Sequence, residues 1–134
     1  MKRLALILTA SAMLTSLALF ADNTPLKEGK NTAINAQYSF TYEFPEKPKL
    51  GTYVLRVNVF KGKEKVKDLI VLASYDMPSM RGHHGSGKPA PMQLNKQNDY
   101  LMPVNFVMRG KWEVVLSFQQ NGKELYNGIF LVEI

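Results

Sequence analysis

The chain contains no cysteine and only two histidines, the neighbours His83 and His84. The absence of thiols excludes a disulfide scaffold, a thiolate metal site, a cysteine nucleophile and an acylated lipoprotein anchor. Two histidines also leave little material for a Ser-His-Asp triad or a three-histidine zinc site. No nucleophile or pair of carboxylates accompanies them, so we expect no enzymatic activity from these 134 residues, which suffice for one domain.

The N-terminal segment has the layout of a secretory signal peptide. Lys2 and Arg3 give a positive start, residues 4–20 are predominantly apolar, and the small residue Ala21 precedes a polar stretch. We predict that residues 1–21 are removed, so that the exported protein is not inserted in a membrane. The apolar run is slightly shorter than the roughly 20 residues that span a bilayer, and an uncleaved anchor is the alternative.

The chain is basic, with 17 Lys and Arg against 11 Asp and Glu and a formal charge of +6. Its densest basic run, residues 61–67, includes Glu64 and lies between two apolar stretches. The run holds no aromatic residue that could stack on a nucleic-acid base. We therefore interpret it as a solvated hairpin tip and expect no nucleic-acid partner.

Apolar and polar residues alternate at period two through most of the remaining chain, which is typical of half-buried β-strands. The apolar run 69–73 suggests a strand buried on both faces, Asn121-Gly122 predicts a type I′ hairpin turn, and Gly128 suggests a bulge. We predict an all-β fold, an antiparallel immunoglobulin-like β-sandwich of about seven strands. The domain occupies residues 32–134 after a flexible leader over residues 22–31. Predicted strands cover residues 34–44, 53–59, 69–73, 92–94, 100–108, 112–119 and 125–134.

Five methionines follow the signal peptide, and all lie between residues 77 and 108. Residues 77–91 contain three prolines, three glycines and both histidines, so we predict a long loop there. Two thioethers and two imidazoles can converge from this one segment. They belong to Met77, Met80 and His83, which are spaced by three residues, and to the adjacent His84.

A thioether is neutral and soft, so it binds Zn²⁺, Mg²⁺ or Ca²⁺ poorly and suits Cu(I), whereas imidazole binds both Cu(I) and Cu(II). A thioether also needs no deprotonation and remains a ligand in acidic surroundings. We therefore predict a site for copper, as Cu(I), Cu(II) or both, near which Asp76 adds an oxygen ligand or accepts an imidazole N–H. Met102 is expected to pack in the core. The predicted ligands are Met77, Met80, His83 and His84, with Met92 or Met108 completing the set.

Two segments carry a resemblance to a known family. The first reads Met77-Pro-Ser-Met80-Arg-Gly-His83-His84, and the second reads Phe106-Val-Met108-Arg-Gly110-Lys-Trp112-Glu113. The pair resembles the YtkA-like domain family, which combines an MP-x-M-x-x-H segment with a later f-x-M-x-G-x-W segment in a small exported β-sandwich. The resemblance covers most of residues 33–134. It implies a periplasmic protein that helps cells tolerate copper beside a heavy-metal efflux system, with Met108 among the motif residues and Trp112 structural.

Two other functions stay open at this stage. Relatives of the FixH type keep a membrane anchor and act in copper oxidase assembly, so retention of residues 1–21 would favour such an accessory. An immunoglobulin-like interaction module without metal would instead use the loop methionines to pack on a partner, and metal titration distinguishes it. Under the copper hypothesis we expect a monomer whose partners are the copper ion and a periplasmic efflux component.

Overall fold

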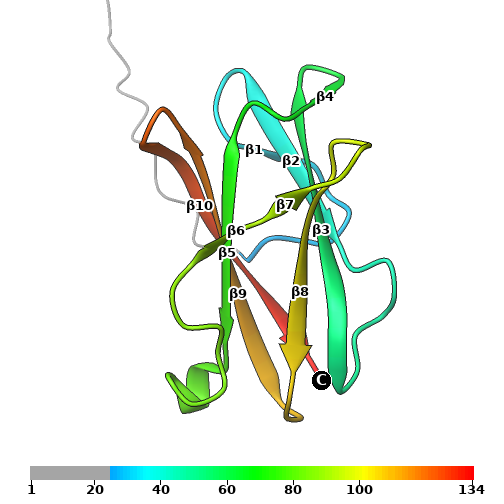
Figure 1. Cartoon of the computed structure of the whole chain (residues 1–134), viewed down its shortest axis with the longest axis vertical. Coiled ribbons are helices and arrows are strands. Elements are labelled where there is room, and N and C mark those ends of the chain that lie inside the picture. The colour runs from blue at the N-terminus through cyan, green and yellow to red at the C-terminus, as the bar shows by residue number, and fades with distance from the viewer. Residues whose placement is uncertain (1–24) are drawn as a thin grey trace, which may run out of the picture.

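The computed structural model describes residues 25–134, and the signal peptide predicted over residues 1–21 lies outside this range. Two antiparallel sheets face one another, so the predicted all-β sandwich is confirmed (Figure 1). The only helical element of the described residues is a 3₁₀ turn, η1 (Pro78–Met80). No helix in this part of the chain is long and apolar enough to cross a membrane.

The larger sheet has six strands in the order β1-β2-β3-β8-β7, and β4 pairs with the part of β3 that β8 leaves free. Its strands are β1 (Thr32–Ala33), β2 (Tyr38–Glu43), β3 (Gly51–Lys61), β4 (Glu64–Val66), β7 (Gln93–Leu94) and β8 (Tyr100–Phe106). The smaller sheet has four strands in the order β10-β9-β5-β6. These are β5 (Ile70–Asp76), β6 (Ala90–Pro91), β9 (Lys111–Gln120) and β10 (Lys123–Glu133).

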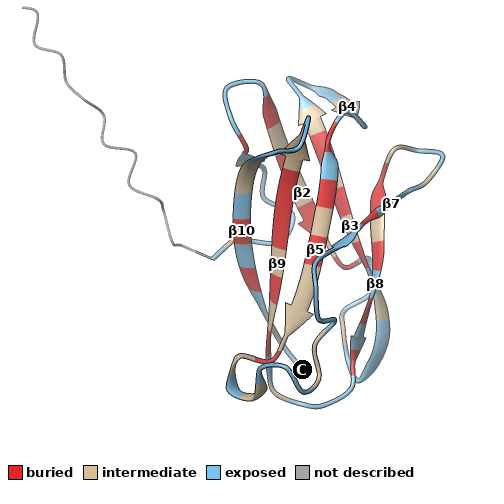
Figure 2. Ribbon diagram, turned by 60° about the vertical axis from the view of Figure 1, so that its left-hand side comes forward, coloured by how far each residue is buried: buried red, intermediate tan, exposed pale blue. Residues whose placement is uncertain are grey.

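The core lies between the sheets and is built from the inward residues of each strand (Figure 2). Aromatic rings join the two sheets. The ring centroids of Phe40 and Phe118 are 4.4 Å apart, and Tyr42 stacks on Phe130 at 3.9 Å. Burial of each such ring stabilises the fold by about 2–3 kcal/mol. The fully buried residues of β9 are Trp112, Val114, Leu116 and Phe118, as the alternating pattern predicted.

The strand predicted over residues 34–44 is shorter in the structure, because β2 begins only at Tyr38. The side-chain oxygen of Asn35 accepts hydrogen bonds from the backbone N–H groups of Gln37 and Tyr38, at 2.9 and 2.8 Å. An Asn side chain stabilises a turn in this way because it replaces a backbone acceptor. The chain therefore reverses between β1 and β2 where the alternating pattern predicted an extended strand.

The prediction that residues 69–73 form a strand buried on both faces is wrong. Val71 and Ala73 of β5 are buried, whereas Ile70 is 53% exposed. β5 lies between β9 and β6, and its outer face is part of the molecular surface. A two-layer sandwich covers only one face of each sheet, and a short apolar run does not reveal how many faces are covered.

Two hairpins have the turns that the sequence predicted. Asn121 and Gly122 connect β9 to β10 with φ angles of 52° and 75°, as a type I′ turn requires. The basic run over residues 61–67 includes the exposed turn between β3 and β4, in which Gly62 has a φ of 63°. The run is therefore a hairpin tip.

Gly128 does not form the predicted bulge. It pairs with Leu116 in register, and the irregularity of β10 lies between Glu124 and Tyr126. A Cβ atom at position 128 would lie 2.8 Å from Cδ1 of Leu26, which is too close for two carbon atoms. The glycine therefore leaves the space in which Leu26 packs on β10.

Residues 25–30, which belong to the leader expected to be flexible, form a strap between the two sheets. The N–H of Leu26 donates to the carbonyl of Ile129 on β10 at 2.9 Å, and the Tyr42 hydroxyl on β2 donates to the Leu26 carbonyl at 2.9 Å. Burial, and secondarily the charge of Glu28, raises the pKa of the Tyr42 hydroxyl, which keeps it a donor. This N-terminal strap crosses the seam between β2 and β10.

Candidate metal site

Asp76, the last residue of β5, sets the path of the loop that carries most of the predicted ligands. Its Oδ1 accepts a hydrogen bond from the N–H of Met77 at 2.8 Å, and its Oδ2 accepts one from the N–H of Gly82 at 3.0 Å. Both carboxylate oxygens thus hold backbone groups. Asp76 positions the loop, a different role from the oxygen ligand or imidazole acceptor that we expected.

The loop then returns to the end of β5. The N–H of Ser86 donates to the Tyr75 carbonyl at 2.8 Å, and the N–H of Tyr75 donates to Ser86 Oγ at 3.0 Å. Gly85 approaches so closely that a Cβ atom there would lie 2.6 Å from the Tyr75 carbonyl oxygen. His83 and His84 therefore occupy a closed loop whose two ends are both fastened to β5.

The turn between β8 and β9 lies against this loop. It carries Met108, whose carbonyl accepts a hydrogen bond from the indole Nε1–H of Trp112 at 2.9 Å. Gly110 in the same turn exchanges two backbone hydrogen bonds of 2.9 Å with Ile134. A Cβ atom at Gly110 would lie 2.9 Å from Cε of Met77, so the methionine methyl group rests on the glycine. This contact joins the two motif segments.

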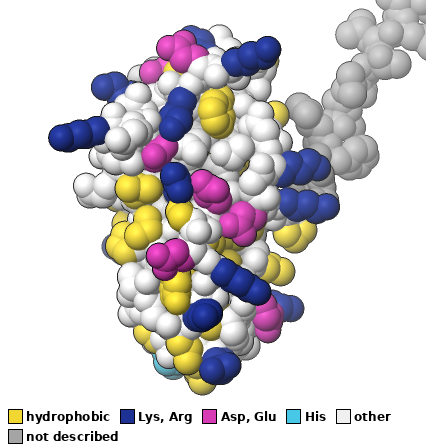
Figure 3. Space-filling view, turned by 90° about the vertical axis from the view of Figure 1, so that its right-hand side faces the viewer, with side chains coloured by type: hydrophobic (Ala, Val, Ile, Leu, Met, Phe, Trp, Pro, Cys, Tyr) yellow, Lys and Arg dark blue, Asp and Glu magenta, His cyan; other side chains and the backbone are white. Residues whose placement is uncertain are grey.

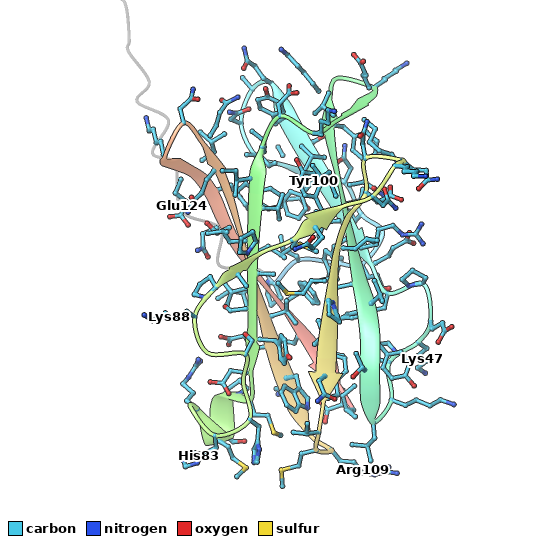
Figure 4. All side chains as sticks on the ribbon, in the orientation of Figure 1. Lys47, His83, Lys88, Tyr100, Arg109 and Glu124 are labelled. Atoms are coloured by element: carbon cyan, nitrogen blue, oxygen red, sulfur yellow. The ribbon has the colours of Figure 1, made fainter. Side chains whose placement is uncertain are left out.

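The predicted ligands at this end differ in how far they reach solvent. Met77 is only 3% exposed, and Met80 is half-buried against the core. Met108 is 42% exposed. His83 is exposed and His84 half-buried, with ring centroids 6.5 Å apart. Figure 4 shows sulfur atoms at the same end of the sandwich as His83, so thioethers and imidazoles share one end of the molecule.

Met92 lies apart from the other five predicted ligands. Its N–H donates to the Val71 carbonyl at 2.8 Å, and its side chain is 6% exposed. Val71 precedes Met77 by six residues of extended chain, which corresponds to about 20 Å at the rise of a β-strand. Met92 is therefore a core residue of the middle of the sandwich. Met102, 8% exposed and paired with Leu55, is in the core as expected.

The charges around the site are mixed. Arg81 of the loop forms an ion pair with Glu113 of β9 at 3.3 Å. Basic and acidic side chains are also mixed on the side of the molecule where β3 and β8 lie (Figure 3). Arg56 of β3 forms an ion pair with Glu43 of β2 at 3.2 Å. Within residues 25–134, no group of three or more His, Asp and Glu side chains could hold a metal ion. A metal at this end would depend on methionine sulfur.

The fold and the loop together define a small β-sandwich with a methionine- and histidine-bearing loop at one end. The YtkA-like family matches residues 23–117, and the chain belongs to this family. The matched region contains both motif segments and ends within β9. No curated protein and no solved structure matches the chain.

The sequence did not identify the residues that fasten the loop. The sequence pattern predicts another role for Asp76 and gives no signal for Ser86 or Gly85. Gly110 appeared only as part of the second motif, and its place there is the signal that could have revealed its contact with Met77. The sequence does not predict these contacts, because the partners of the anchoring residues are distant in sequence or are backbone atoms.

Proposed function

We propose that this protein binds copper ions and passes them to a partner protein, a role of binding and transfer without catalysis. The observation that carries the proposal is the contact of Met77 with Gly110, which puts the loop beside the turn that bears Met108. The proposed ligands are the thioethers of Met77, Met80 and Met108 together with His83 or His84. Membership of the YtkA-like family supports the same role.

The proposed ligands suit reversible binding. Thioethers hold Cu(I) without releasing protons, and imidazole accepts either copper oxidation state. The buried Met77 would anchor the ion, while the more exposed Met108 and His83 would exchange with the ligands of a partner. Because Asp76 and Ser86 fasten both ends of the loop to β5, this exchange requires no rearrangement of the sandwich.

We further propose that the protein acts in the periplasm after removal of residues 1–21. The whole chain, with its predicted signal peptide, resembles the periplasmic copper-resistance determinant CrdA of epsilonproteobacteria, so a periplasmic component of a heavy-metal efflux system is the proposed recipient. N-terminal sequencing of the exported protein tests the cleavage. A protein that retains residues 1–21 would instead support an oxidase-assembly accessory of the FixH type.

The copper site is tested by anaerobic Cu(I) titration against a chromophoric competitor, with Cu(II) and Zn²⁺ as parallel titrants. Met77→Leu and Met80→Leu remove the sulfur atoms while conserving side-chain volume, so the fold is retained. His83→Ala and His84→Ala test the imidazoles. Met92→Leu is the matched control, because Met92 lies beside Val71, about 20 Å along β5 from Met77.

We expect stoichiometric Cu(I) binding that the Met77→Leu and Met80→Leu pair weakens strongly and the Met92→Leu control leaves unchanged. Binding no tighter than that of a generic exposed histidine, and insensitive to these changes, would contradict the proposal. The protein would then be an interaction module without metal.

A further inference from the structure

β10 is an edge strand whose outer side is only partly covered. Ile134 and Gly110 exchange two backbone hydrogen bonds, so the backbone groups of Ile134 point toward the β9 side. This direction alternates along a strand, and the N–H and C=O groups of Leu131 and Glu133 therefore point away from β9. Ile129 belongs to the same set, and its carbonyl accepts a hydrogen bond from the N-terminal strap. Within residues 25–134, the strap thus pairs with this edge at Ile129 and leaves the next two outward positions uncovered.

A groove between the two sheets runs beside this uncovered edge. It has a volume of about 390 Å³, and Tyr42, Phe44 and Phe130 contribute aromatic rings to its lining. Leu26, Lys27 and Glu28 of the strap also line the groove. At Pro48 it meets a second hollow that extends to Arg109 in the β8–β9 turn. An extended chain lying on β10 would therefore have an apolar surface under alternate side chains.

Positive charge exceeds negative charge only when the groove and the second hollow are taken together as one seam, which four cations and two acidic residues border. Its acidic residues are Glu28 and Glu133, and one oxygen of Glu28 accepts a hydrogen bond from the backbone N–H of Phe44 at 2.8 Å. Among the described residues, none of its cations forms an ion pair. Unpaired cations beside an open strand edge favour a ligand of negative charge. The cations are Lys27, Lys47, Lys49 and Arg109.

We propose that the seam from the strap to Arg109 binds an extended acidic segment of a partner protein, which adds to β10 as a further strand. The backbone of the segment pairs with Leu131 and Glu133, its inward side chains pack on Phe44 and Phe130, and its carboxylates face the bordering lysines. The segment ends next to Met108. If the partner that carries this segment is the copper acceptor, docking brings the acceptor close to the proposed copper ligands. This consequence rests on the copper-binding function proposed above.

The probe is a fluorescein-labelled peptide of about eight residues in which valine alternates with glutamate, long enough to follow the edge. Its binding to metal-free protein is followed by fluorescence anisotropy. We expect binding that weakens about fivefold for each hydrogen-bonding peptide amide that is N-methylated, because a lost backbone hydrogen bond costs about 1 kcal/mol. A peptide with lysine in place of glutamate should not bind. These comparisons use the unaltered protein and do not depend on the folding of any variant.

Variants locate the site. Leu131→Pro removes an outward N–H that makes no bond to β9, a change that an edge strand tolerates. It should weaken peptide binding about fivefold, because one backbone hydrogen bond is lost. Lys47→Glu with Lys49→Glu reverses the charge of the border and should weaken binding by a similar factor. The matched control, Lys63→Glu with Lys67→Glu, makes the same change of charge near the β3–β4 tip and should leave binding within about twofold.

The proposal is wrong if the acidic peptide does not bind, or if N-methylation and Leu131→Pro both leave its binding unchanged. It is also wrong if the protein dimerises in analytical ultracentrifugation through this edge and the peptide does not compete, since a second copy is then the occupant. Copper titration of Leu131→Pro is expected to match the unaltered protein. Peptide docking and copper binding can therefore fail independently of each other.

Discussion

The methyl group of Met77 rests on Gly110, where a Cβ atom would lie only 2.9 Å from the methionine Cε. Gly110 also has a φ of 134°, a backbone conformation that residues with a side chain rarely adopt. The same glycine thus permits both the backbone conformation of the β8–β9 turn and the close packing of Met77. Because Gly110 has no side chain, the loop that carries Met77 contacts this turn directly.

Gly110→Ala should therefore displace Met77 and strain the turn. We expect a loss of about 2 kcal/mol in the free energy of unfolding, measured by urea denaturation, together with weaker Cu(I) binding. Gly87→Ala, in the loop that carries His83 and His84, is the control, because Gly87 has a φ of 77° but nothing lies within 4 Å of an added Cβ. Unchanged Cu(I) affinity in Gly110→Ala would show that the contact does not shape the site.

Asp76→Ala should loosen the loop at both of the backbone groups that the carboxylate holds. We expect faster hydrogen exchange at the amides of Met77 and Gly82, and Cu(I) affinity reduced about fivefold, because hydrogen bonds to a charged acceptor are lost. Asp68→Ala is the comparison, since Asp68 accepts a hydrogen bond from Tyr38, far from the loop. Exchange rates at Met77 and Gly82 that match those of the unaltered protein would contradict the positioning role.

Asp99 should make stability depend on pH. Burial opposes ionisation of this carboxyl, which is 6% exposed, but hydrogen bonds from Lys65 at 2.6 Å and Asn95 at 3.0 Å outweigh it, so the pKa of Asp99 lies below its usual value. Because the pKa is lower in the folded protein, the stabilisation is present above the unfolded pKa of about 3.9 and is lost as pH falls through the folded value.

We expect Asp99→Asn to lower the free energy of unfolding by about 2 kcal/mol at neutral pH, as measured by urea denaturation. The difference from the unaltered protein should shrink as the pH falls from neutral through the folded-state pKa of Asp99, below which both states carry a protonated carboxyl. Glu46→Gln, at an exposed position of the β2–β3 loop, is the control. A difference that stays constant across this range would argue against ionic stabilisation by Asp99.

Gly128→Ala should force the N-terminal strap away from β10, because the new Cβ would lie 2.8 Å from Leu26. We expect destabilisation of about 2 kcal/mol and easier proteolysis before β1. Leu26→Ala in the same chain should recover part of this loss, since it removes one of the two side chains that the new Cβ would meet, the other being Tyr126 at 2.9 Å. Strictly additive effects of the two substitutions would mean that the close approach does not limit stability.

Much of the fold was predictable because its determinants are local. Apolar and polar residues that alternate along a strand show which of its faces is buried, as along β9. Asn and Gly adopt positive φ readily, so the turn at Asn121 and Gly122 follows from these two residues alone. The failures came from contacts that no short window contains. The side chain of Asn35 forms a turn that delays the start of β2 to Tyr38, and Gly128 leaves space for Leu26 instead of forming a bulge.

The sequence by itself determined the composition of the candidate site, because Met77, Met80, His83 and His84 follow one another within a single loop. Only the tertiary structure distinguished between the two remaining predicted ligands, Met92 and Met108. The antiparallel path of the chain puts Met92 beside Val71 near the start of β5 and places the β8–β9 turn with Met108 against the end of the same strand. Spacing along a chain sets which residues share a turn or a face, whereas the pairing of distant strands sets which turns meet.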